Sequence, residues 1–145
     1  MMDRRTARDT AFSLIFESEF QKELLPEELY AAEREAGGFE DDEYVRNVFF
    51  GVMQHREEID EKIEAHAVGW KTKRMSKVVL AALRLSVYEM MHFEEAELPY
   101  RVSINEAIEL VKKYETGDAP KFTNGILSAV ATELGKKEAA GTNAD

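Results

Sequence analysis

The stretch from Met75 to Phe93 constrains the fold more than any other part of the chain. Its apolar residues recur every three or four positions, which is the period of an α-helix, and further apolar residues widen the stripe beyond one face. They are Met75, Val78, Val79, Ala82, Leu83, Leu85, Val87 and Met90. A helix that is apolar around most of its circumference needs neighbours on several sides. We therefore predict that this stretch is the central helix of an all-α domain.

The chain before this stretch also follows the helical period, and it lacks the alternation that strands require. Asp3 is placed to cap a first helix that reaches about Phe20, with Ala7, Ala11, Leu14 and Ile15 on its buried face. Pro26 predicts the start of a short second helix, which the glycines at 37 and 38 end. Asp41 or Asp42 then caps a third helix, which we expect to continue for about 25 residues. Gly51 in this helix predicts a close approach by another element.

After the central helix, Ser103 to Glu106 fits a capping box, so we expect the next helix to begin there. A last helix is expected to start near Asp118 and to end near Leu134. Residues 135–145 lack apolar anchors and are predicted to form a disordered tail behind a single domain, residues 1–134. The total is about six to seven helices. Trp70 is predicted to plug the core over a helix end, with a base-stacking platform as the alternative.

The net charge of −10 is unevenly placed, because residues 17–64 hold 16 acidic and five basic side chains. This acidity argues against general coating of DNA or RNA and leaves room for a local anion site near the N-terminus. The absence of cysteine excludes disulfides, thiolate catalysis and cysteine zinc sites. No apolar run is long enough for a membrane span or a signal peptide, so we expect a cytoplasmic protein.

The sequence offers little for catalysis or for binding a metal ion. His55 and His66 are 11 residues apart. That is about 16 Å along one helix, too far for both to bind one metal ion. Glu89 and His92 match one Glu-x-x-His element of di-iron bundles, but those bundles need that element on two helices. No phosphate-binding glycine loop or hydrolase motif is present. We therefore expect no metal, no cofactor and no enzymatic activity.

The remaining candidate is a surface that recognises RNA. Arg4, Arg5 and Arg8 lie within about 100° of one another on the first helix. A helix N-terminus disfavours cations, but backbone N–H groups and arginines together suit a phosphate. Lys121 and Phe122 combine a cation and a ring, as single-stranded RNA sites do. The alternatives are arginines that are merely exposed and a Phe122 that belongs to the core.

Four segments, in chain order, resemble the NusB family of transcription antitermination factors. They are Arg4–Arg8, Leu83–Glu89, Pro99–Lys112 and Lys121–Leu127, and the resemblance extends from Arg4 to about Leu134. It implies a helical bundle of two packed three-helix halves. It also implies binding, together with the ribosomal protein NusE, to the boxA element of nascent ribosomal RNA, and action within the RNA polymerase antitermination complex.

By the same resemblance, Arg4, Arg5 and Arg8 would contact RNA phosphates and base edges. Lys121 and Phe122 would add charge and stacking, and Asp118 would be a polar contact. Thr6 stands where many members carry another arginine, so binding of RNA alone is expected to be weak. Some members are homodimers that cover the arginine helix. The alternatives are a structural homodimer, or a stand-alone targeting domain related to ribosomal RNA methyltransferases, without RNA binding of its own.

Overall fold

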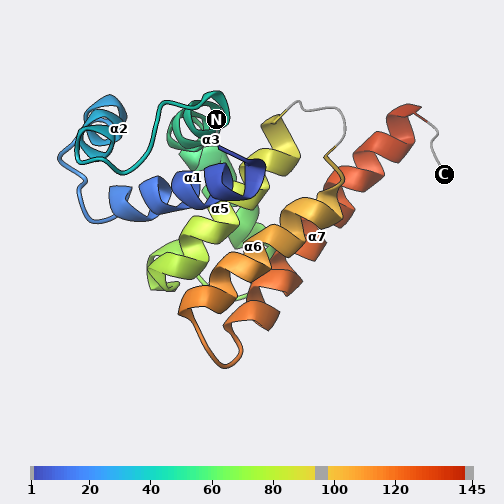
Figure 1. Cartoon of the computed structure of the whole chain (residues 1–145). Coiled ribbons are helices and arrows are strands. Elements are labelled where there is room, and N and C mark those ends of the chain that lie inside the picture. The colour runs from blue at the N-terminus through green and yellow to red at the C-terminus, as the bar shows by residue number, and fades with distance from the viewer. Residues whose placement is uncertain (1, 94–97, 143–145) are drawn as a thin grey trace.

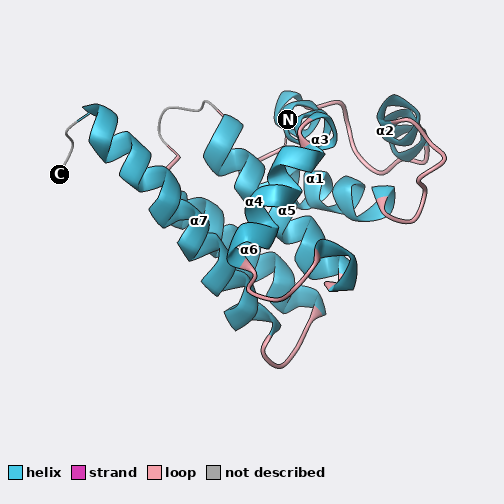
Figure 2. Ribbon diagram, turned by 180° about the vertical axis from the view of Figure 1, so that it is seen from behind, coloured by secondary structure: helices cyan, strands magenta, loops and turns pink. Residues whose placement is uncertain are grey.

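The computed structural model describes the backbone of residues 2–93 and 98–142 and the side chains up to residue 135. Within these residues the chain forms seven α-helices and one short 3-10 helix, η1, and no strand (Figures 1 and 2). The elements are α1 Arg4–Ser18, α2 Pro26–Glu35, α3 Glu43–Gln54, α4 Arg56–His66, η1 Thr72–Arg74, α5 Lys77–His92, α6 Tyr100–Tyr114 and α7 Ala119–Thr142. The predicted all-α class is confirmed.

Helix α5 is the centre of the fold, as its sequence predicts. It begins after Ser76, whose hydroxyl oxygen accepts a 3.0 Å hydrogen bond from the Val79 N–H. Every residue from Val79 to Met90 is buried. The helix packs against α1, α3, α4, α6 and α7, and Figure 1 shows it beneath α1 and α6. Because its whole circumference is covered, α5 fixes the positions of all five neighbours.

The other helices form two halves around α5. Helices α1, α2 and α3 make one half, with α2 packed on α1, and helices α4, α6 and α7 make the other. Asp3 begins α1 as predicted, because its carboxylate accepts a 2.8 Å hydrogen bond from the Thr6 N–H. The largest wholly buried apolar side chains come from both halves and from α5: Leu14, Ile15, Leu29, Phe49, Ile59, Ile63, Leu80, Leu83, Leu85 and Leu127.

Gly51 is the point of closest packing between α3 and α5. A Cβ atom added there would overlap the ring of Tyr88. The same tyrosine donates a 2.8 Å hydrogen bond to Asn47, one turn earlier on α3, so its ring cannot easily turn away. The predicted close approach at Gly51 is confirmed, and Tyr88 is the side chain that makes it.

We expect Gly51→Ala to lower the free energy of unfolding by about 1–3 kcal/mol, because the added methyl group overfills the contact with Tyr88. Gly125 is the matched control, since a Cβ atom there meets nothing within 4 Å and the residue lies inside α7. Gly125→Ala should be neutral or stabilising by up to about 1 kcal/mol. Urea unfolding followed by circular dichroism measures both. Equal effects of the two substitutions would contradict the packing argument.

The prediction of a single long third helix from Asp41 or Asp42 is wrong, because the helix is interrupted at His55. The backbone of His55 has φ −103° and ψ 19°, so α3 ends at Gln54 and α4 begins at Arg56. Ile59 and Ile63 of α4 are still wholly buried. The helical period therefore continues across the break, and for that reason periodicity alone does not reveal it.

The structure corrects two further predictions. Helix α6 begins at Tyr100 after Pro99, one turn before the predicted capping box, and Ser103 is buried inside the helix. Its hydroxyl group bonds Ser86 and Glu89 of α5, so it does not cap α6. Trp70 is not a core plug, because 50% of it is exposed. The buried apolar residues on either side of Trp70 in the chain are Ala67 and Met75.

Helix α7 is longer than its apolar period predicts. Its backbone remains helical to Thr142, whereas a helix end was expected near Leu134. The run from Lys136 to Ala140 consists of good helix formers, which favour a helix without any apolar partner. The helix end at 134 is thus corrected. The single domain over residues 1–134 and the disorder of residues 135–145 stay predictions.

Candidate functional site

Arg8 lies inside the protein, although the sequence groups it with Arg4 and Arg5. Only 3% of the residue is exposed. Its Nε and Nη2 atoms donate hydrogen bonds of 3.1 and 3.0 Å to Oε2 of Glu89 on α5. Arg8 directly follows Ala7 on the buried face of α1, and this position turns its side chain toward α5. The prediction that Arg8 contacts RNA is corrected here, since its guanidinium group is enclosed by its own chain.

Glu89 is the acceptor around which this buried polar cluster forms. The hydroxyl group of Tyr44 on α3 donates a 2.6 Å hydrogen bond to Oε2, and Ser103 on α6 donates a 2.8 Å bond to Oε1. Burial, together with the Glu89 carboxylate, raises the pKa of Tyr44 far above its ordinary value. Burial works against the charge of Arg8, but the attraction of Glu89 outweighs it, and the pKa of Arg8 rises. Four helices are thus joined by one carboxylate.

Arg4 and Arg5 lie beyond this cluster at the start of α1. The Arg4 guanidinium carbon sits 4.5 Å from the ring centre of Tyr44 and 5.5 Å from that of Phe93, at cation–π distance. The Arg5 side chain is 74% exposed and makes a 3.1 Å ion pair with Glu106 of α6. A hydrogen bond to Glu106 raises the pKa of Arg5. The cluster around Glu89 therefore supports the surface on which both arginines stand.

The start of α7 carries the second group of predicted site residues. Its first turn is closed by the Phe122 N–H, which donates a 2.9 Å hydrogen bond to the Asp118 carbonyl oxygen. Asp118 and Lys121 are exposed, and Phe122 is half-buried against the core. The Phe122 ring also meets the exposed Trp70 edge to face, with 5.9 Å between ring centres. Phe122 therefore fits both sequence interpretations, a core residue and a surface ring.

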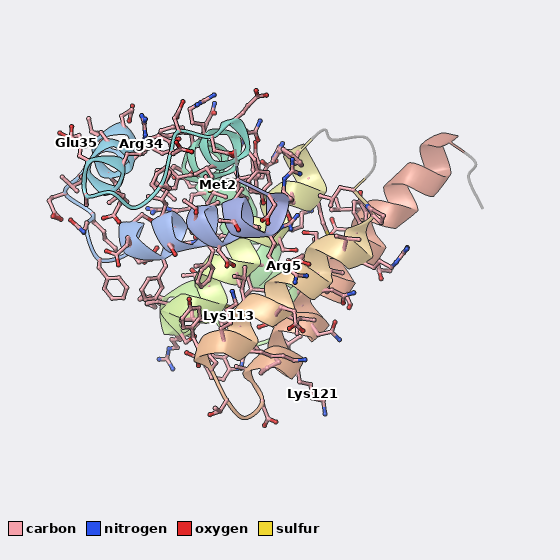
Figure 3. All side chains as sticks on the ribbon, viewed as in Figure 1. Met2, Arg5, Arg34, Glu35, Lys113 and Lys121 are labelled. Carbon is pink, nitrogen blue, oxygen red and sulfur yellow. The ribbon has the colours of Figure 1, made fainter. Side chains whose placement is uncertain are left out.

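Helix α6 lies between these two groups. Glu106 pairs with Arg5, and Lys113, about 10 Å further along the helix axis, forms a 3.0 Å ion pair with Asp9 of α1. Figure 3 shows Arg5, Lys113 and Lys121 in this order on the face turned to the viewer. Cations from α1, α6 and α7 thus follow one side of the molecule, and Arg5 and Lys113 are each paired with a carboxylate.

Sequence reasoning missed the residues that support this surface. Ser103 was expected to cap a helix, whereas it shares a 2.8 Å hydrogen bond with Ser86 beside Glu89, and Tyr44 bonds the same carboxylate. The available signal was the presence of polar residues at apolar positions of a helix that is otherwise buried all round, namely Arg84, Ser86 and Glu89 of α5. Such residues need polar partners, and these can come only from neighbouring helices.

The chain is similar to known proteins over most of its length. Residues 5–132 match the model of the NusB family. A relative from Acetivibrio thermocellus, named transcription antitermination protein NusB, is 43% identical over 130 residues, which are 89% of this chain and 88% of the relative. In the described residues, no helix combines the length and the apolar character that crossing a bilayer requires.

Solved structures agree with this match. A structure of NusB from T. maritima has a TM-score of 0.82 and 31% identity, and the likeness covers 94% of this chain and 96% of that one. A structure of the antitermination factors NusB and NusE in complex with double-stranded RNA has a TM-score of 0.78 and 32% identity over 90% of this chain and 96% of that one. The chain belongs to the NusB family.

Proposed function

We propose that this chain is a non-catalytic, cytoplasmic transcription antitermination factor that binds the boxA element of nascent ribosomal RNA together with NusE. In this role it acts within the RNA polymerase antitermination complex. One observation carries the proposal: the likeness to NusB bound to NusE and RNA extends over 90% of the chain. The row of cations on α1, α6 and α7 supports it, because Arg5, Lys113 and Lys121 are exposed on one side of the molecule.

The RNA contacts proposed are Arg4 and Arg5 at one end of this row and Lys121 and Phe122 at the other. Arg8 takes a supporting role instead, through its ion pair with Glu89. Trp70 joins the set, since its exposed ring beside Phe122 offers a second face on which an unstacked base can lie. Asp118 remains a candidate polar contact, because it is exposed one turn before Phe122.

Binding is proposed to depend on the protein partner. The chain carries a net charge of −10, which repels RNA, and the cations of the site are partly neutralised by Glu106 and Asp9. A basic ribosomal partner complements the acidic surface and adds its own phosphate contacts. RNA and partner would then raise each other's affinity through one shared coupling free energy. The protein would respond only when both are present.

A structural homodimer is the second candidate, and a row of aromatic rings favours it. Phe12 stacks on Tyr114 at 5.8 Å between ring centres, and Phe16 lies 5.0 Å from Phe20. Phe20 is 58% exposed and Tyr114 is 60% exposed. Exposed rings just after α1 and at the end of α6 suit an apolar contact with a second copy. This candidate predicts that RNA does not bind under any condition.

Titration of a boxA-like RNA at several salt concentrations, with and without NusE, tests the proposal. Wild-type protein should bind more tightly with NusE present. The Arg5→Ala/Lys121→Ala variant should bind more weakly, and its salt slope should fall by about 0.7 for each phosphate of single-stranded RNA that is no longer neutralised. Arg34→Ala is the matched control, because Figure 3 shows this arginine on α2, away from the row of cations.

Phe122→Leu and Trp70→Ala should each weaken binding about 5- to 150-fold, the equivalent of one base stack, with the salt slope unchanged. Leucine keeps an apolar side chain against the core at the half-buried position, so loss of helical circular dichroism in Phe122→Leu would assign that ring to the core. If the Arg5→Ala/Lys121→Ala variant binds RNA as well as Arg34→Ala does, the proposed surface is wrong. If wild-type protein never binds RNA, the homodimer replaces the proposed function.

A further inference from the structure

Two histidines and a glutamate meet where α3, α4 and α5 come together, on residues that the proposed function does not use. His55 is the residue at the break between α3 and α4, Glu58 lies in the first turn of α4, and His92 ends α5. The His92 Nε2 atom is 2.7 Å from Oε1 of Glu58, and the His55 Nδ1 atom is 3.5 Å from that oxygen. One nitrogen from each ring and the carboxylate oxygen lie within 4.8 Å of one another.

The packing around these side chains brings both rings together. The imidazoles stack on each other at 4.2 Å between ring centres and 17° between planes. The Tyr88 ring lies 5.6 Å from His92 and 6.3 Å from His55. Tyr88 is itself fixed by its contact with Gly51 and its hydrogen bond to Asn47. The packing of α3, α4 and α5 therefore brings the two rings together, although they are 37 residues apart in the chain.

This donor set matches a transition-metal ion better than a hard cation. Two imidazole nitrogens and one carboxylate oxygen are the protein ligands of open zinc sites, in which water fills the fourth position. Magnesium and calcium prefer oxygen ligands throughout. Zinc–ligand bonds of about 2.0–2.1 Å in a tetrahedron place neighbouring donors about 3.3 Å apart. The observed separations of 2.7 and 3.5 Å from Glu58 lie on either side of that value. The stacked rings must turn about their Cβ–Cγ bonds so that one nitrogen of each ring points at the same ion.

The site is also accessible and electrostatically suited to a cation. The side chains of His55, Glu58 and His92 are 36%, 49% and 28% exposed, which leaves a path for an ion and its water. The surface pocket beside His55 and Glu58 is also lined by Glu57 and Glu61, against one cation, Arg56.

We propose that His55, Glu58 and His92 form a binding site for a divalent transition-metal ion of the zinc class. The ion would clamp the end of α5 to the junction of α3 and α4. This site differs from the Glu-x-x-His element in the sequence, since Glu89 is enclosed by Arg8, Tyr44 and Ser103, whereas His92 turns toward Glu58. The expectation of a protein without metal is replaced by one testable site.

Metal-free, untagged protein titrated with zinc chloride in a calorimeter, in competition with a chelator of known affinity, tests the site. We expect one ion per chain and a rise in the thermal midpoint on saturation, because the ion binds only the folded arrangement. His92→Gln and His55→Gln should each weaken binding at least tenfold and abolish the rise in thermal midpoint. Circular dichroism without metal confirms that both variants are folded.

His66→Gln is the matched control, because this third histidine bonds Glu133 of α7 at 2.7 Å and lies outside the cluster. It should bind zinc as wild-type protein does. Cobalt(II) provides an independent signal, since a tetrahedral site gives strong visible absorption that the His92→Gln variant should lack. Absence of saturable binding of one ion per chain, or an equal loss of affinity in His66→Gln and His92→Gln, would overturn the proposal.

Discussion

Replacing Glu89 by alanine is expected to lower the free energy of unfolding by about 3–5 kcal/mol. The Glu89 side chain has no exposed surface, and the Arg8 side chain that it binds is 4% exposed. Removal of the Glu89 carboxylate would leave the Arg8 charge buried. Its remaining ion pair would be with Glu106, 3.8 Å away. The hydroxyl groups of Tyr44 and Ser103 would lose this acceptor at the same time, and Ser103 would keep its bond with Ser86. Loss of a partner from a buried pair costs far more than loss of a surface pair.

Urea unfolding followed by far-ultraviolet circular dichroism measures this change. Glu109→Ala is the matched control, because Glu109 lies on α6 and makes an exposed 3.6 Å pair with Lys112, so its loss should cost less than about 1 kcal/mol. The double variant Arg8→Met/Glu89→Met removes both buried charges and should be more stable than Glu89→Ala. If Glu89→Ala loses no more stability than Glu109→Ala, Glu89 does not hold the four helices together.

Arg84→Ala is expected to lower the free energy of unfolding by about 3 kcal/mol, the second largest effect. Arg84 is 4% exposed on α5, and its Nε and Nη2 atoms donate hydrogen bonds of 2.9 and 2.8 Å to the two oxygens of Asp60 on α4. Its Nη1 atom bonds Glu19, directly after α1. The substitution removes the guanidinium group that both carboxylates bind. Lys77, 3.7 Å from Glu19, offsets only part of the loss.

The pH dependence of this effect has a definite sign. Burial disfavours the charged form of Glu19, but the Arg84 bond outweighs burial and lowers the pKa of Glu19 below its ordinary 4.5. A carboxylate with a lowered pKa stabilises the fold above its ordinary pKa and loses that contribution as the pH falls through the lowered value. The stability difference between wild type and Arg84→Ala should therefore be full at neutral pH and should shrink below about pH 4.5.

Arg56→Ala is the control for this second prediction. Arg56 lies 4.0 Å from the same Glu19 oxygen, but its side chain is 43% exposed. Its removal should cost less than about 1 kcal/mol. Chemical unfolding at pH 7 and at pH 4 compares the three proteins. Equal losses for Arg56→Ala and Arg84→Ala, or a difference that grows as the pH falls, would show that Arg84 does not carry the contact between α1, α4 and α5.

The helices could be predicted from the sequence wherever the apolar face of a single helix determines the structure. Met75 to Phe93 is apolar round its circumference, and the structure buries it among five helices. Asp3 and Ser76 cap α1 and α5 through their own neighbours along the chain. These outcomes depend on contacts within about one turn, or on the total apolar surface of a segment, and the residue order contains both.

The side chains of the candidate site are positioned by contacts between segments that are far apart in the sequence. Arg4, Arg5 and Arg8 look equivalent in the sequence, yet Arg8 is buried because Glu89 lies 81 residues away in the chain and 3.0 Å away in space. Ser103 fits a cap but bonds Ser86 and Glu89 instead. Trp70 has the large apolar side chain of a core residue. The positions of α4 and α7 nevertheless leave it on the surface beside Phe122.

The sequence by itself therefore determined an all-α protein built around one central helix, because periodic apolar residues must be covered wherever they lie. It also supplied the segments that resemble the NusB family. Only the tertiary structure decided which arginine is buried, that the helix is interrupted at His55, and that His55 approaches His92. The physical reason is that a polar side chain can bond any partner within reach, and helix packing alone determines which partner that is.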